Sequence, residues 1–164
     1  MKKLFVVGDS ISVHYGDFLS NELCGDFSCI PREGMQEALE NINIPVGGNG
    51  GDSSRVLDFL QTQASAGKMD YDILVFNCGL HDIKRNPPEG ELQIQPEQYS
   101  KNLYEIIELV RENGVFPVFL TTTPVDDEIH HAYLEQNFGI ERFSADVLEY
   151  NQIAVRIMQE LKVP

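Results

Sequence analysis

Four segments of small and polar residues could carry the chemistry of this chain. Gly-Asp-Ser at residues 8–10, Gly-Leu-His-Asp at 79–82 and Thr-Thr-Thr at 121–123 each follow a short apolar run, and a glycine-rich loop at 47–51 precedes a helical pattern. In an open parallel sheet, ligands bind beyond the carboxyl ends of the strands. We therefore expect the four segments to meet along one edge of such a sheet.

Ser10 is the candidate nucleophile. It stands between an apolar run and a helical pattern, where the helix dipole and unpaired backbone N–H groups would stabilise a developing oxyanion. A serine that attacks an acyl group needs such a place. The same serine could equally cap the helix, and a lone Gly-Asp-Ser does not distinguish the two roles. The glycine loop, likewise, is either a set of N–H donors for a ligand or a flexible turn.

Other polar residues are candidates for supporting roles. His14 lies four residues after Ser10, so on a helix it could reach the same edge and touch a substrate. Arg32 could pair with a substrate carboxylate. Asp127 and His130 spell an Asp-x-x-His sequence, but it lies in a long polar connection, where we expect a solvated loop and no metal site.

Residues 8–10, 50–53 and 79–82 resemble, in order and spacing, the first, second and third sequence blocks of the SGNH (GDSL-like) hydrolase family, and the resemblance extends along essentially the whole chain. The resemblance implies Ser10 as the nucleophile, with its own N–H and that of Gly51 as oxyanion donors. His81 stands where the family has an asparagine whose amide is the third donor. A histidine N–H can donate a hydrogen bond, but its ring is larger and titrates near neutral pH, so His81 is interpreted as a donor, a base or a substrate contact.

The resemblance also predicts an activity. It implies hydrolysis of a small or sugar-linked acyl ester through an acyl-enzyme, without metal or organic cofactor. Asp9, His14 and Asp82 are predicted to contact this substrate. The family's last block, an Asp-x-x-His that supplies the general base, follows a final strand. No counterpart follows the last helical pattern here, so we expect the last strand and this block to be missing.

The apolar patterns predict alternating strands and helices. Strands buried on both faces are predicted where apolar runs do not alternate with polar residues: 3–7, 27–30, 72–78 and 115–120. Helices are predicted where apolar residues recur at helical spacing: 12–23, 53–66, 97–113 and from 144 onward. Asp52 or Ser53 and Ser144 are expected helix caps. Residues 84–95 and 125–143 are expected to be polar connections.

This alternation predicts the fold class. We expect one α/β domain over residues 1–164, a three-layer α/β/α sandwich with a parallel flavodoxin-like sheet in the order 2-1-3-4-5. Without its last strand, the sheet would have an open edge through which copies of the chain could associate.

Composition limits the partners. Twelve Lys and Arg stand against 26 Asp and Glu, and the formal net charge of −14 would repel nucleic acid and anionic membranes. An odd number of cysteines, three, and an N-terminal apolar run too short for a signal peptide predict a cytoplasmic protein with free thiols.

Three alternatives stay open. A phospho-receiver module would need an aspartate where Asn77 stands and an acidic pair where the first strand offers Asp9 alone. A flavodoxin-like FMN binder would need a Ser/Thr-rich phosphate loop after the first strand. An SGNH-like domain that binds a ligand without turnover is suggested by His81 and the missing last block.

Overall fold

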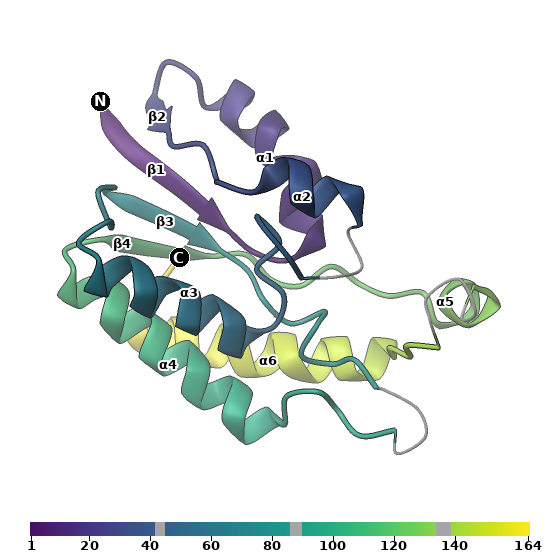
Figure 1. Cartoon of the computed structure of the whole chain (residues 1–164). Coiled ribbons are helices and arrows are strands. Elements are labelled where there is room, and N and C mark those ends of the chain that lie inside the picture. Colours follow the sequence, from purple (N-terminus) through teal and green to yellow (C-terminus); the bar gives the residue numbers. More distant parts are fainter. Residues whose placement is uncertain (42–44, 86–89, 134–138) are drawn as a thin grey trace.

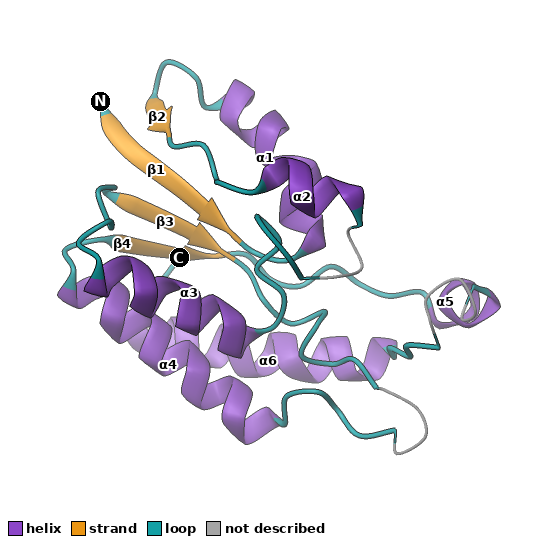
Figure 2. Cartoon of the chain, in the orientation of Figure 1, coloured by secondary structure: helices purple, strands orange, loops and turns teal. Residues whose placement is uncertain are grey.

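A four-stranded parallel sheet lies between two layers of helices (Figures 1 and 2). The computed structural model describes residues 1–41, 45–85, 90–133 and 139–164. The strands are Lys2–Val7 (β1), Phe27–Cys29 (β2), Ile73–Phe76 (β3) and Phe116–Phe119 (β4). Their order is β2-β1-β3-β4, which confirms the predicted three-layer architecture and the first four places of the predicted order. The described residues contain no fifth strand.

The helices cover both faces of the sheet. They are Ser10–Glu22 (α1), Met35–Glu40 (α2), Ser53–Ser65 (α3), Pro96–Glu112 (α4), Asp127–Ala132 (α5) and Ser144–Leu161 (α6). From β1 the chain first moves to β2 at one edge of the sheet. It then returns past β1 to β3 and continues to β4 at the other edge. Right-handed crossovers then place α1 on one face and α3 and α4 on the opposite face, as Figure 1 shows.

Burial on both faces explains why the strands read as continuous apolar runs. Phe5 and Val7 of β1 belong to the large core beneath α3, α4 and α6. Leu4 and Val6, which point the other way, form a second core against α1. No helix in the described part of the chain is both long enough and apolar enough to cross a membrane.

Two short helices were not predicted. Of α2 only Ala38 is buried, and α5 buries no residue, so neither leaves an apolar stripe in the sequence. The expectation of a solvated loop over 125–143 is therefore wrong for α5, which Asp126 caps through Ile129 N–H at 3.0 Å. Ser144 was expected to cap α6 but is its first residue. Its N–H and hydroxyl instead donate to Asp127, at 2.6 and 2.9 Å.

The outer edge of β4 offers few backbone donors. Phe116 and Leu120 donate their N–H groups toward β3, so Pro117 and Phe119 face outward. Pro117 has no N–H, which is how a proline is tolerated in an edge strand. The Phe119 N–H donates to the Pro164 carbonyl oxygen at 2.9 Å, and the C-terminus accordingly lies beside β4 (Figure 1). Association through this edge stays a prediction.

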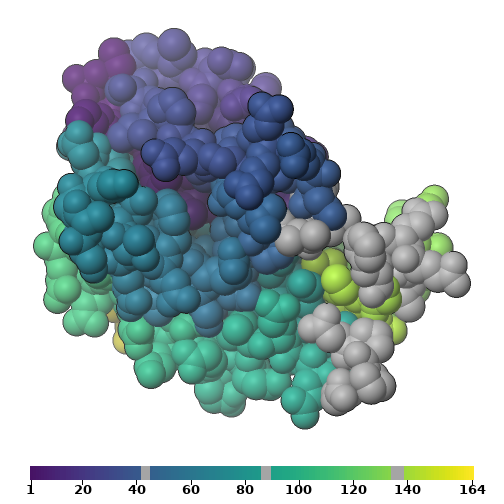
Figure 3. Space-filling model, viewed as in Figure 1, coloured from purple at the N-terminus to yellow at the C-terminus, as the bar shows by residue number. Residues whose placement is uncertain are grey.

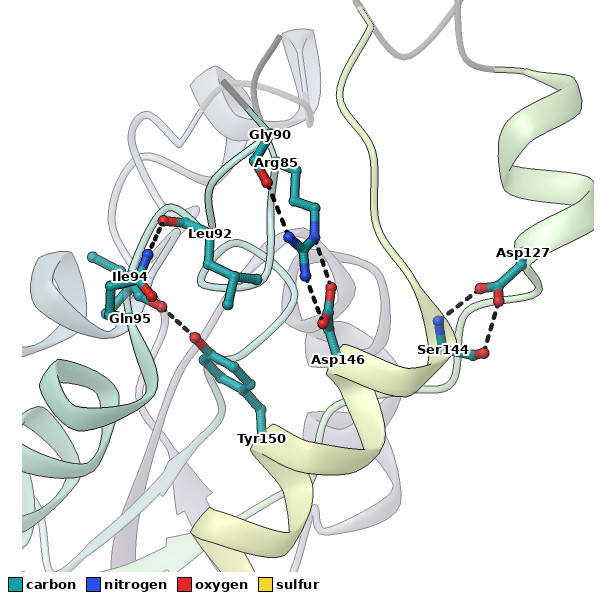
Figure 4. A network of polar contacts seen from close by, with 9 residues as sticks. All are labelled: Arg85, Gly90, Leu92, Ile94, Gln95, Asp127, Ser144, Asp146 and Tyr150. Atoms are coloured by element: carbon teal, nitrogen blue, oxygen red, sulfur yellow. Dashed lines mark hydrogen bonds and ion pairs between the residues drawn. The ribbon is translucent and has the colours of Figure 1, made fainter. Parts of the chain in front are cut away.

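A polar network attaches the connection after β3 to α6 (Figure 4). The Arg85 guanidinium donates two hydrogen bonds to the Asp146 carboxylate, at 2.8 and 3.0 Å, and a third to the Gly90 carbonyl at 2.9 Å. The Tyr150 hydroxyl donates to the Ile94 carbonyl. These contacts hold the segment that begins at the carboxyl end of β3, where the predicted third block lies.

We expect Asp146→Ala to lower the free energy of unfolding by about 2 kcal/mol, because it leaves a half-buried guanidinium without its anion. Lys101→Ala is the matched control. It removes an exposed i, i+4 ion pair at 3.7 Å and should cost less than about 0.5 kcal/mol. Urea unfolding of both variants measures the difference. Equal costs would show that the Arg85–Asp146 pair contributes no more than a surface pair.

Candidate functional site

The structure brings the predicted segments together at the carboxyl ends of the strands. The Gly50 N–H donates to the Gly8 carbonyl at 2.7 Å, which ties the glycine loop to the end of β1. The Thr122 hydroxyl donates to the Cys78 carbonyl at 3.1 Å, which ties the end of β4 to the end of β3. The topology alone predicted this convergence.

Ser10 is the first residue of α1 and is partly exposed. The cap is Asp9, whose Oδ1 accepts a hydrogen bond from the Ile11 N–H at 3.0 Å. The alternative that Ser10 caps the helix is therefore wrong. Within the described ranges no hydrogen bond joins the Ser10 hydroxyl to a histidine ring. His14 is exposed one turn further along α1 and makes no hydrogen bond to Ser10.

Asp9 is fully buried beneath this turn. Burial raises the pKa of its carboxyl, and the neighbouring Asn77 amide, the Ile11 N–H and the Arg142 guanidinium oppose that rise. A Cβ at Gly8 would lie 1.9 Å from the Asn77 Oδ1, so only glycine leaves room for this amide. Asp9 thus shapes the turn that presents Ser10, and its predicted contact with substrate stays a prediction.

Gly51 stands directly before the cap of α3. Its φ of +68° lies in the left-handed region, which favours glycine. A Cβ added at this position would also lie only 2.7 Å from the Pro45 Cβ. Its N–H donates to the Asn49 Oδ1 at 3.1 Å, so the predicted oxyanion donor is engaged by a neighbouring side chain. The cap itself is Asp52, one of the two predicted residues, whose Oδ1 accepts from the Arg55 N–H at 3.0 Å.

Asp82 lies deeper than a substrate contact would. It is fully buried, and its carboxyl accepts hydrogen bonds from the Ser53 N–H, at 3.0 and 3.1 Å, and from the Ser53 hydroxyl. The Asn102 amide of α4 in turn donates to the Ser53 hydroxyl oxygen at 2.8 Å. Asp82 therefore positions the third block against the start of α3. Burial raises the pKa of Asp82 to about 7, although the Ser53 hydrogen bonds oppose the rise.

His81 is buried, with 2% of its surface exposed, and its Nδ1 has no hydrogen-bond partner in the described part of the chain. Burial, followed by the charges of Lys84, Arg142 and Arg55, lowers the pKa of His81 to about 3. The ring is therefore neutral at physiological pH. A neutral imidazole still carries one N–H and can donate one hydrogen bond.

The Asp-x-x-His sequence makes local contacts. Asp127 binds Ser144, as described above, and the His130 Nε2 lies 3.1 Å from the Ile140 carbonyl oxygen. Neither is hydrogen-bonded to Ser10. Among the described residues, no three His, Cys, Asp or Glu side chains form a cluster that could hold a metal ion.

Two cations at the site were not identified from sequence. Arg142 precedes α6 and donates its Nε–H to the Leu80 carbonyl at 2.7 Å, and Lys84 is buried just after the third block. The only signal for Arg142 was its place in a long polar connection. Arg32, which was singled out, donates to the Ser12 hydroxyl at 2.8 Å and to the Gly8 carbonyl at 3.3 Å.

A cavity of about 460 Å³ adjoins the glycine loop between β1 and α3. Its apolar lining includes Phe5, Val7, Ile30, Phe59 and Tyr71. Asn49 and Gly50 line the end toward the site, whereas Ser10 and His81 do not line the cavity. Figure 3 shows this side of the molecule, with purple atoms of the N-terminal strand between the blue segment that follows β2 and α3.

Comparison with known proteins identifies the fold. No protein-family model matches the chain, and no curated protein sequence matches it. A proposed acylhydrolase from Bacteroides fragilis aligns with a TM-score of 0.68 at 18% identity, over 99% of this chain and 65% of that one. A GDSL-like lipase from Bacteroides thetaiotaomicron aligns at 0.63 and 13%, over 99% and 66% of the two chains.

The chain has an SGNH hydrolase-like fold. A carbohydrate acetylesterase from Sinorhizobium meliloti shares this SGNH-like fold, with a TM-score of 0.62 at 13% identity, over 99% of this chain and 82% of that one. The resemblance inferred from the three blocks is thus confirmed for the fold. The chain spans slightly less than two thirds of both Bacteroides proteins. The absence of the last block stays a prediction.

The buried Asp82 should make stability depend on pH. Its pKa is about 7 in the folded chain and near its ordinary 3.8 in the unfolded chain, so the folded form binds more protons between these values. The free energy of unfolding contributed by Asp82 therefore falls as pH rises from about 4 to about 7. Urea unfolding of the wild type and Asp82→Asn at several pH values should show their difference falling over this window. A difference independent of pH would contradict the assignment.

Proposed function

We propose that this chain is a serine ester hydrolase of the SGNH type that acts on a small or sugar-linked acyl ester. The observation that supports this most directly is the meeting of three segments on one edge of an SGNH-like sheet. Ser10 begins α1, Gly51 precedes α3 and His81 follows β3. The esterase and acylhydrolase names of structures with the same fold agree with this reaction.

In the proposed reaction the Ser10 oxygen attacks the ester carbonyl carbon while a base takes the hydroxyl proton. The N–H groups of Ser10, Gly51 and neutral His81 hold the oxyanion, for which the Gly51 N–H must exchange Asn49 for the substrate oxygen. Collapse of the tetrahedral intermediate expels the alcohol, which receives the proton. Water then hydrolyses the acyl-enzyme and restores Ser10. By resemblance to the family, the base is a histidine oriented by an aspartate.

A second candidate function is binding of an ester without turnover. Two observations favour it: the Gly51 N–H is engaged by Asn49, and no histidine ring in the described ranges is hydrogen-bonded to Ser10. The two functions differ in whether Ser10 forms a bond to the ligand.

Ser10→Ala should abolish protein-dependent hydrolysis of 4-nitrophenyl acetate, with a loss of at least about a hundredfold, because Ser10 forms the acyl-enzyme in the proposed reaction. Rates are measured with and without added imidazole, which can replace a base that does not reach Ser10. Each rate is corrected for hydrolysis in the same solution without protein, because imidazole itself hydrolyses this ester. Ser65→Ala, an exposed serine at the end of α3, is the control and should retain the rate. Hydrolysis that survives Ser10→Ala would overturn the proposal. A wild type that binds the ester but never hydrolyses it would support the second function.

His81→Ala should lower kcat by about 10²- to 10³-fold, the usual cost of losing an oxyanion donor. His81→Asn should retain most of the wild-type kcat, because the asparagine amide can donate the same hydrogen bond. Because the pKa of His81 is about 3, the pH–rate profiles of the wild type and His81→Asn should have the same shape above pH 5. Steady-state rates with 4-nitrophenyl acetate from pH 5 to 9 give both comparisons. If Asn is as harmful as Ala, His81 acts as something other than a neutral donor.

A further inference from the structure

Arginine side chains lie against the backbone of each of the three blocks. Arg32 donates to the carbonyl of Gly8 in the first block, at 3.3 Å. Arg142 donates to the carbonyl of Leu80 in the third block, at 2.7 Å. Arg55 lies beside Gly51 of the second block. Three of the chain's six arginines therefore contact or adjoin the three blocks.

Arg55 packs against the second block. A Cβ placed on Gly51 would lie 3.0 Å from the Arg55 Cδ and 3.1 Å from its Nε. One terminal nitrogen of the guanidinium donates to the Pro45 carbonyl at 2.5 Å. Arg55 also lines the 460 Å³ cavity beside Asn49, as Arg32 does from the other side of the glycine loop.

Among the residues that the structure describes, these three guanidinium groups have no anionic partner at contact distance. Within the described ranges, the ion pairs shorter than 4.0 Å involve Lys3, Arg85 and Lys101. The chain carries 26 acidic residues, so acids that could have paired with these arginines are abundant. The buried Asp9 influences both Arg32 and Arg142 electrostatically, but it forms no ion pair shorter than 4.0 Å with either of them.

The partners that these arginines do have are uncharged: backbone carbonyl oxygens, the Ser12 hydroxyl and, for the Arg32 Nε–H, the Met35 sulfur at 3.3 Å. Backbone carbonyls and the Ser12 hydroxyl use only some of the five N–H donors that each guanidinium carries. The remaining donors are held in place by those contacts and suit the paired oxygens of a carboxylate, phosphate or sulfate. The acids at the cavity rim, Glu33 and Asp70, are exposed, and Asp70 is paired with Lys3.

We propose that the ester bound at this site carries a negatively charged group, a carboxylate, phosphate or sulfate, and that Arg32, Arg55 and Arg142 provide the positive charge that attracts it. The charge concentrates anionic ligands at the site of a protein whose net charge of −14 otherwise repels them. The identity of the substrate class rests on the proposed hydrolase function, whereas binding of the anion does not require Ser10.

The test compares esters that differ only in charge. On the alcohol side the pair is 4-acetoxybenzoate and 4-acetoxybenzamide, with 4-acetoxyphenyl phosphate to distinguish phosphate from carboxylate. On the acyl side the pair is 4-nitrophenyl hydrogen adipate and 4-nitrophenyl hexanoate, because the longer spacer keeps the carboxylate from attacking its own ester. Each rate is divided by the rate of hydrolysis by hydroxide. We expect kcat/KM for an anionic member to exceed that of its neutral partner at least about tenfold, and the ratio to fall as NaCl rises from about 20 to about 300 mM.

Variants then locate the preference. Arg142→Gln and Arg55→Gln should each lower the anionic-to-neutral ratio at least about fivefold, because each removes a charge-assisted contact. Arg156→Gln, which removes an exposed arginine of α6, is the matched control and should leave the ratio within about twofold of the wild type. Equal rates within both pairs, or a preference that survives all the site variants, would overturn the inference.

A binding measurement separates this inference from the proposed function. Titration calorimetry of Ser10→Ala with 4-acetamidobenzoate and with 4-acetamidobenzamide compares the charged and neutral amide analogues. Tighter binding of the charged analogue, lost in Ser10→Ala combined with Arg142→Gln, supports the inference even if the wild type hydrolyses neither ester. Equal binding of the two analogues overturns it, whatever the hydrolysis experiments show.

Discussion

The buried hydrogen bonds between Asp82 and Ser53 hold the site together. They join the end of β3 to the start of α3, and Asn102 extends the connection to α4. Gly51 lies two residues before Ser53 and His81 one residue before Asp82, so these bonds set where both predicted oxyanion donors stand. A carboxyl in this position is costly to bury. The N-terminus of α3 offsets that cost, because it supplies an N–H donor and the positive end of a helix dipole.

The electrostatics of the site differ from those of the chain as a whole. The net charge is strongly negative, yet the groups around His81 are Lys84, Arg142 and Arg55. These charges lower the pKa of His81 in addition to burial, which is the largest cause. The same burial keeps the His81 ring neutral, as a donor rather than a proton carrier. Local potential is therefore set by which side chains fold together, and the sum of charges over the sequence does not describe it.

Much of the framework was predictable from local patterns. The runs around Val6, Val75 and Val118 do not alternate, and the strands they form are covered on both faces over much of their length. Once the strands were parallel, topology alone placed their polar ends on one edge. The helices α2 and α5 escaped prediction because their residues face solvent on nearly all sides. Asp82 was expected to contact a substrate because it belongs to the third block, and nothing local in the sequence reveals that its partner, Ser53, lies 29 residues away.

What the sequence by itself determined is the order of the strands and of the four longer helices, the SGNH-like resemblance and the identity of Ser10 and Gly51 as candidates. These follow from periodicity and from the order and spacing of the motifs. Only the tertiary structure decided that Asp82 is a buried support, that His81 is neutral and that Arg142 reaches the third block. Burial and charge arise between residues distant in the chain, and the fold has to form before either exists.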